Sequence, residues 1–121
     1  MADTWAIPED RPLTPAEQKL IQWLLEHGSA EAMVYLPQLG KARVVSRCSC
    51  GCASIDFAID GVVPLLTAPM GILADFQWKV GNGPLFGVFV FARSGLLAGL
   101  EIWSVDGLAT ANALPDVALL E

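Results

Sequence analysis

LFGVFVFARSGLLAGLEIWS, residues 85–104, is the stretch that decides the fold of this chain. Two apolar runs flank Ser94-Gly95, and a short turn of this kind between apolar runs is typical of a β-hairpin. The turn fixes the register of the two strands. The predicted partners are Arg93 with Leu96, Phe89 with Leu100, and Val88 with Glu101.

Both faces of this predicted hairpin are apolar except at Glu101. Strands that are apolar on both faces are covered on both faces. Helices can cover only one of them, so either the tail, residues 106–121, or a second subunit must cover the other. We favour a second subunit, which predicts a homo-oligomer, and a two-fold dimer is the commonest closed assembly. One predicted face carries Phe86, Val88, Val90, Leu97 and Trp103, and the other carries Phe89, Phe91, Leu100 and Ile102.

Side chains also alternate with a period of two in three further segments, near residues 41–49, 53–60 and 70–80. The first two form a second hairpin if the turn is centred on Cys50-Gly51. That register sorts apolar from polar side chains cleanly, which supports it. The predicted pairs are Val44 with Phe57 and Ala42 with Ile59. With residues 85–93 and 96–104, the predicted sheet has about five strands.

The N-terminal part of the chain predicts two helices. Thr14-Pro15-Ala16-Glu17 combines a capping residue, a proline in the first turn and a capping-box glutamate. His27-Gly28 predicts the end of this helix, with the glycine at positive φ. Ser29 can cap a second helix, whose end Pro37 weakens.

The predicted fold class is therefore α+β, with two N-terminal helices packed on one face of a mostly antiparallel sheet. Residues 1–12 contain Pro8 and Pro12 among charged residues and predict a flexible arm, although Trp5 could dock on the body. Residues 13–121 predict a single domain, as the length of 121 residues suggests.

Composition narrows the classes of function. The chain is 54% hydrophobic and 17% charged, with a mean hydropathy of +0.50, so it has more apolar surface than a small monomer easily hides. The net charge of −6 argues against nucleic acid and anionic membranes and would favour a basic protein partner. No signal peptide starts the chain, and its longest apolar run, residues 84–92, is too short for a membrane helix of ~20 residues. We expect a soluble cytoplasmic protein.

All three cysteines lie in one pentapeptide, Cys48-Ser49-Cys50-Gly51-Cys52. An odd number of cysteines fits a reducing compartment. In a flat hairpin Cys48 faces the apolar side, Cys52 the other side, and Cys50 lies in the turn. The three sulfur atoms would then diverge, and no fourth ligand is near, so we expect reduced thiols, no metal ion and no cofactor.

Three interpretations of the pentapeptide stay open. The first is a metal site, because thiolates bind soft metal ions well. The second is thiol chemistry, with Arg47 as the adjacent cation and Cys50–Cys52 as the better-placed disulfide pair. The third is a structural turn, in which Gly51 supplies a backbone conformation closed to other residues and the cysteines pack as small side chains. The candidate functional residues are Arg47, Cys48, Cys50, Gly51, Cys52 and Glu101, and no catalytic residue is assigned.

Glu101 is a candidate because it stands between Leu100 and Ile102 on an apolar strand, where a buried acid needs a partner such as Arg43 or Arg47. A structural ion pair, or exposure at a groove, is the simpler reading of it. His27, in the last turn of a helix, fits a capping role better than that of a base. The tryptophans predict core or rim positions, and an exposed subset could line a binding groove. They are Trp5, Trp23, Trp78 and Trp103.

The segments 38–45, 47–52 and 54–57 resemble a family of short uncharacterised bacterial proteins. Members share the Cys-x-Cys-Gly-Cys element, an initial Leu-Thr-Pro-x-Glu helix start (Leu13 to Glu17 here) and a glycine turn followed by Leu-x-x-Leu-Glu (Gly95, then Leu97 to Glu101). The resemblance covers roughly residues 13–105, and it departs from the family at Ala53, where Pro or Thr is frequent. It implies a stand-alone bacterial domain of unassigned function.

Two functions from different classes follow from these observations. The first is a small, acidic, non-enzymatic interaction or accessory module, of immunity type for example. The alternative is a small metal- or thiol-dependent protein that uses the cysteine cluster.

Overall fold

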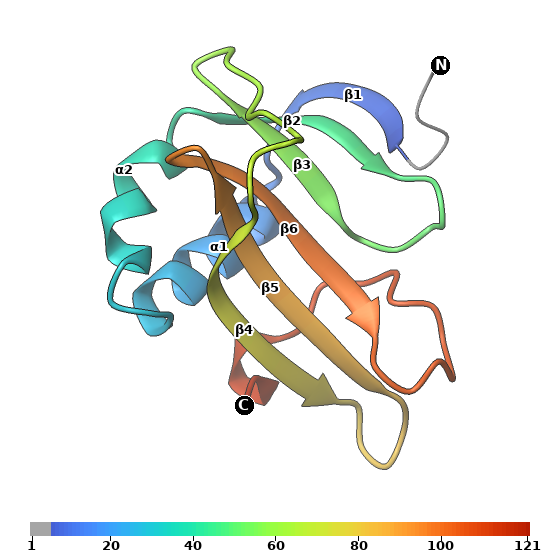
Figure 1. The fold of residues 1–121 in the computed structure, drawn as a ribbon. Helices are drawn as coiled ribbons and strands as arrows, with labels where there is room; N and C mark the ends of the chain where they lie inside the picture. Colours follow the sequence, from blue (N-terminus) through green and yellow to red (C-terminus); the bar gives the residue numbers. More distant parts are fainter. Residues whose placement is uncertain (1–5) are drawn as a thin grey trace.

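The structure, a computed structural model, describes residues 6–121 and has the predicted α+β fold (Figure 1). Six antiparallel strands form one sheet in the order β1-β2-β3-β6-β5-β4, one strand more than expected. Among the described residues, no helix is long and apolar enough to cross a membrane. The strands are β1 (Ala6–Pro12), β2 (Ala42–Cys48), β3 (Ile55–Ile59), β4 (Gly71–Lys79), β5 (Leu85–Arg93) and β6 (Leu96–Ser104). The helices are α1 (Pro15–His27), α2 (Leu36–Leu39) and the 3-10 turns η1 (Ala32–Tyr35) and η2 (Val117–Leu119).

The additional strand is β1, in the segment that we expected to be a flexible arm. Residues 6–12 instead pair antiparallel with β2 as an edge strand. Prolines are tolerated on an edge strand because one side of it needs no hydrogen bonds. Ion pairs from Glu9 to Arg47 (2.8 Å) and from Asp10 to Arg43 (2.9 Å) add to the backbone pairing. Residues 1–5, including Trp5, lie outside the described residues.

Helix α1 begins with the predicted capping box. Thr14 Oγ1 accepts the Glu17 N–H (3.1 Å), and Glu17 Oε1 accepts the Thr14 N–H (2.8 Å). Arg11 donates to the same carboxylate at 2.9 and 3.1 Å. Burial alone would raise the pKa of Glu17, but the hydrogen bonds from Arg11 and Thr14 outweigh it and lower the pKa. The helix thus presents its apolar side to the sheet, with Leu20, Ile21, Leu24 and Leu25 buried.

The second predicted helix is broken into two short pieces, η1 and α2. Pro37 lacks an N–H and lies at the start of α2, where that group would be unpaired in any case. A continuous helix from Ser29 would place it in the interior instead. In α2, the Gln38 amide donates to the Gly95 carbonyl (2.9 Å) and accepts the Leu97 N–H (2.8 Å). The short helix therefore holds the β5–β6 turn.

Gly28 ends α1 for a reason that differs from the predicted one. Its φ is −88°, so it is not in the left-handed region. A Cβ at this position would lie 2.3 Å from the Leu73 carbonyl oxygen on β4. The same carbonyl accepts the Ser29 N–H at 2.8 Å. Glycine is required here because the chain passes directly against an edge strand of the sheet.

The hairpin registers are largely as predicted. Val44 pairs with Phe57, and Ala42 pairs with Ile59. In β5–β6 the turn pair Arg93–Leu96 is also correct, but the register shifts between Phe91 and Ala92. The predicted pairs beyond the turn are therefore wrong by one residue. Phe89 lies opposite Glu101, Val88 opposite Ile102, and Val90 opposite Leu100.

This β-bulge changes which β6 side chains face the core. Bulges insert an additional residue on one strand, and here Ala98 has no partner between Leu97 and Gly99. Gly99 leaves room for the Phe91 ring, which would lie 2.7 Å from a Cβ there. The sequence predicted Leu100 and Ile102 on the other face of the hairpin from Val88, but they join Val88 in the core beneath α1. Trp103, predicted on the face of Val88, instead joins Phe89 and Phe91 on the outer face.

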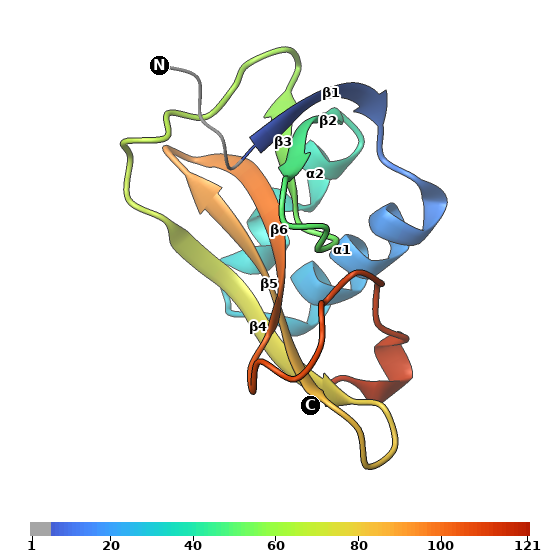
Figure 2. The ribbon, with the colours of Figure 1, turned by 90° about the vertical axis from the view of Figure 1, so that its right-hand side faces the viewer.

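The tail does not cover that outer face. Leu114, Val117 and Leu120 pack against the same core as α1, and Glu121 exchanges two backbone hydrogen bonds with Gln77 on β4 (2.9 and 3.1 Å). Figure 2 shows the tail and α1 on one side of the sheet and the connection between β3 and β4 on the other. The sequence predicts only a connection between two strands for residues 60–70. This connection forms the partial cover of the outer face.

We predict that Gly28→Ala destabilises the protein by about 1–3 kcal/mol, because the added methyl group must displace backbone of β4. The matched control is Gly40→Ala. Gly40 has helical φ and ψ and open space around it, so this change should be neutral or stabilise by up to ~1 kcal/mol. Chemical denaturation of both variants measures the difference. Equal losses would contradict the close approach.

Candidate functional site

The cysteine pentapeptide forms the turn between β2 and β3, as predicted. Gly51 has φ +89°, in the region that side chains other than hydrogen disfavour. The turn is held at both ends. The Cys48 N–H donates to the Ser54 carbonyl (3.3 Å), and the Ala53 N–H donates to the Ala111 carbonyl of the tail (2.8 Å). These bonds give the turn a fixed base on the sheet and on the tail.

The three sulfur atoms converge, which corrects the prediction that they diverge. Cys48 Sγ lies 2.7 Å from Cys50 Sγ, which lies 2.8 Å from Cys52 Sγ. All three sulfurs lie within 4.8 Å of one another. The flat-hairpin argument failed because β2 ends at Cys48 and β3 begins only at Ile55. The residues between form a curled loop, in which alternation of side-chain direction no longer holds.

The three thiols are electrostatically unequal. Burial, followed by the hydrogen bond with Cys50, raises the pKa of Cys48 to about 12. The hydrogen bonds from Cys48 and then Cys52 lower the pKa of Cys50. Cys50 is exposed, whereas Cys48 and Cys52 are half-buried. The arrangement therefore favours the thiolate form of Cys50, at the surface, with a sulfur atom on either side.

Two other candidates are not part of this cluster. Arg47 forms an ion pair with Glu9 through its Nε (2.8 Å), so its charge is directed to β1. His27 Nδ1 lies 2.8 Å from the Trp23 carbonyl, and its ring stacks on the Trp23 indole with centroids 4.1 Å apart. His27 thus has the terminal role on α1 that the sequence suggested.

Glu101 lies on the outer face, half-buried, with neither arginine as its partner. Arg43 pairs with Asp10 and Arg47 with Glu9. Burial is the largest influence and raises the pKa of Glu101, the nearby Ser54 hydroxyl opposes it, and the charge of Asp56 adds to the rise, so that the pKa lies above its ordinary value. The ion pairs among residues 6–121 do not include Glu101, so the structural ion pair that the sequence suggested does not form there.

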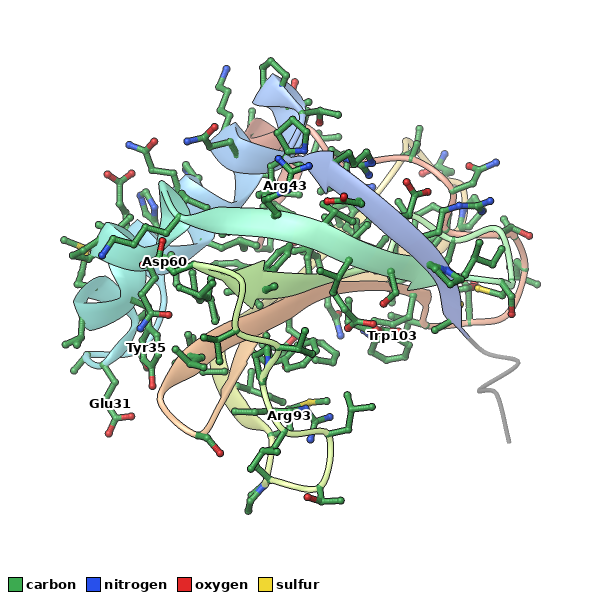
Figure 3. The ribbon with its side chains drawn as sticks, turned by 90° about the horizontal axis from the view of Figure 1, so that it is seen from above. Glu31, Tyr35, Arg43, Asp60, Arg93 and Trp103 are labelled. Carbon is green, nitrogen blue, oxygen red and sulfur yellow. The ribbon has the colours of Figure 1, made fainter. Side chains whose placement is uncertain are left out.

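Sequence reasoning missed the surface beside Glu101. A pocket of about 150 Å³ opens on the outer face between β2, β3 and the 60–70 connection. Arg93 lines it and donates to the carbonyls of Leu66 (3.2 Å) and Ala68 (2.6 Å), with its guanidinium over the Phe91 ring. Figure 3 shows Arg93 and Trp103 on the side of the sheet away from α1. Further lining residues are Ser46, Asp56, Val63, Leu66 and Ala98.

One sequence signal could have located this surface. Residues 61–74 contain no charged residue, although they lie between Asp60 and Asp75 in a chain of net charge −6. Uncharged apolar segments in exposed connections are typical of interaction surfaces. Six large apolar side chains of this segment are exposed, whereas Leu73 is buried: Val62, Val63, Leu65, Leu66, Met70 and Ile72.

Comparison with known proteins gives no relative for this chain. No protein-family model, no curated protein and no solved structure matches it. The resemblance to Cys-x-Cys-Gly-Cys proteins therefore stays a prediction, and function has to be argued from the geometry.

We predict that Gly51→Val destabilises the domain more than Cys50→Ser. Valine at φ +89° costs about 1–3 kcal/mol, whereas serine replaces an exposed thiol with a group of similar size. Thermal melts of the two reduced, metal-free variants test this. If Cys50→Ser is the more damaging change, the thiols rather than the glycine hold the turn.

We predict that Glu101→Gln stabilises the protein at pH 7 by less than about 1 kcal/mol, because the site is half-exposed and solvent screens it. The folded-state pKa is raised above the ordinary value of 4.5, so the fold disfavours the charged form. The unfolded state then binds fewer protons, and stability falls as pH rises from 4.5 through the folded pKa. Melting curves should show the advantage of the variant at pH 7 and its loss near pH 4. An advantage independent of pH would contradict the electrostatic origin.

Proposed function

We propose that this protein is a non-enzymatic interaction module of accessory type, and that it binds protein through the outer face of its sheet. The observation that carries the proposal is the uncharged segment 61–74, with its six exposed large apolar side chains. We call this segment the apolar face. A surface of this kind is costly to leave in water, which favours a partner.

The apolar face is held in place by the sheet rather than left as a loose loop. The Ile59 N–H donates to the Val62 carbonyl, and the Val62 N–H donates to the Ile59 carbonyl, both at 2.9 Å. Arg93 holds the middle of the segment through the Leu66 and Ala68 carbonyls. A preformed surface loses little conformational entropy on binding, which supports specific recognition.

The partner that this face fits best is a second copy of the chain. Two acidic chains repel each other, but the segment that would meet in a two-fold contact has no charge. Apolar surfaces are self-complementary without matched polar groups, and a two-fold axis brings the same patch together on both subunits. A basic partner is the competing occupant, because Asp56 and Glu101 lie beside the face and Asp75 ends the segment.

The candidate residues support a binding role over an enzymatic one. His27, Glu101 and the cysteine cluster lie on separate elements, α1, β6 and the β2–β3 turn, and each has local partners. We also propose a cytoplasmic location, which is supported by three thiols, an odd number, in one short turn.

We predict that the wild-type protein has twice the chain mass of 12.9 kDa by light scattering at micromolar concentration, and that Leu66→Asp has the mass of one chain. Leu66 is 73% exposed, so the change should not unfold the protein. A carboxylate in an apolar interface, by contrast, is strongly disfavoured.

Leu108→Asp is the matched control, because Leu108 is 76% exposed but lies in the tail. It should leave the dimer intact. A wild-type mass of one chain would overturn self-association and leave a basic protein as the occupant to be tested. Dissociation by Leu108→Asp alone would move the interface away from the apolar face.

A further inference from the structure

We propose that Cys48, Cys50 and Cys52 form a three-thiolate site for one soft metal cation, with Cu(I) as the cation whose chemistry fits best. The inference is independent of the apolar face, since it concerns the opposite end of the β2–β3 hairpin. It departs from the sequence-based expectation of no metal ion, which depended on divergent sulfur atoms and on a missing fourth ligand. The sulfur atoms converge, and a cation that is satisfied by three thiolates needs no fourth ligand.

The ligand atoms are already gathered. Metal–sulfur bonds are about 2.3 Å long, so three sulfurs around one ion lie roughly 4 Å apart. The two neighbouring sulfur pairs here are 2.7 and 2.8 Å apart, and no two of the three sulfurs are more than 4.8 Å apart. An ion would open the neighbouring pairs by roughly 1 Å, which side-chain rotation can supply.

The backbone of the turn stabilises negative charge on sulfur. The Cys50 N–H points to Cys48 Sγ at 3.4 Å, and the Cys52 N–H points to Cys50 Sγ at 3.3 Å. Hydrogen bonds to the charged form of a group favour that form. The Cys-x-Cys repeat thus aligns two backbone amides with two of the three sulfur atoms.

The number of ligands selects the metal ion. Within residues 6–121, the three cysteines form a group of three with no histidine or carboxylate added to it. His27, the chain's one histidine, is engaged with Trp23 on α1. Structural zinc requires four protein ligands. Soft thiolates select Cu(I), which is satisfied by two or three of them.

The site can load from solvent without unfolding. Cys50 is exposed, and the bonds from Cys48 to Ser54 and from Ala53 to Ala111 hold the base of the turn. Binding forms copper–sulfur bonds in exchange for S–H bonds, and the thiol protons go to solvent, with no electron transferred. Thiol ligands lose their protons when they bind a metal ion, so binding at this site releases protons.

The test is an anaerobic titration of the reduced full-length chain with Cu(I) in competition with a chelator, followed by native mass spectrometry and near-ultraviolet absorbance. We expect one Cu(I) per chain, a thiolate-to-metal absorption band and protection of all three thiols from alkylation. Loss of outer-shell groups alone weakens metal sites 10–100-fold, so Cys50→Ser should weaken binding by more than about 100-fold. Apparent affinity should fall by up to about tenfold per unit decrease in pH for each proton that binding releases.

Two controls keep the result specific. Leu66→Asp, on the apolar face, should bind Cu(I) as the wild type does, so failure of the dimer and failure of the metal site are separable. Zn(II) in the same titration should be removed by the chelator. No ion retained by the fully reduced chain, or Zn(II) held more tightly than Cu(I), would overturn the proposal. Unchanged binding by Cys50→Ser would overturn it too.

Discussion

The seam between β3 and β6 is the contact on which the rest of the molecule depends. The sheet consists of two three-stranded halves, β1-β2-β3 and β6-β5-β4, and only Ile55–Leu100 and Asp56–Gly99 pair across the middle. The buried Ser54 hydroxyl extends the seam by donating to the Ile102 carbonyl (3.1 Å) and accepting the Ile102 N–H (2.8 Å). A hydroxyl that bonds both backbone groups of one residue fixes where the two halves meet.

The seam also sets the positions of the two candidate surfaces. Ser54 follows the cysteine turn directly, so the base of the thiol cluster is anchored at the seam. Asp56 lies on the outer face next to it and lines the pocket that Arg93 and the 60–70 connection complete, and its charge raises the pKa of Glu101. One short contact therefore supports a metal-binding turn at one end and an apolar face at the other, each with its own chemistry.

The sequence was most informative where local rules act alone. The capping box at Thr14 and Glu17, the two hairpin turns and the approximate bounds of β2 to β6 follow from neighbours in the chain and were predicted. The predictions that were wrong concern features that depend on how segments of the chain pack in three dimensions. The bulge at Ala98 depends on the packing of the Phe91 ring over Gly99. The need for glycine at position 28 depends on the close approach of strand β4. The convergence of the three sulfur atoms depends on the curled shape of the β2–β3 loop. Residues 6–12 form a strand because they pair with β2. Their prolines led instead to the prediction of a flexible arm.

The two edges of the sheet determine what kind of assembly is open to this protein. On β4, the backbone of Leu73 is bonded to Ser29, and that of Gln77 to Glu121. On the other edge, β1 carries Pro8 and Pro12, which have no N–H to donate. Neither edge offers an uninterrupted row of free backbone groups, so strand-by-strand polymerisation into filaments has no template. In the proposed dimer, self-association is directed to a face, where a two-fold contact closes after one partner and stays finite.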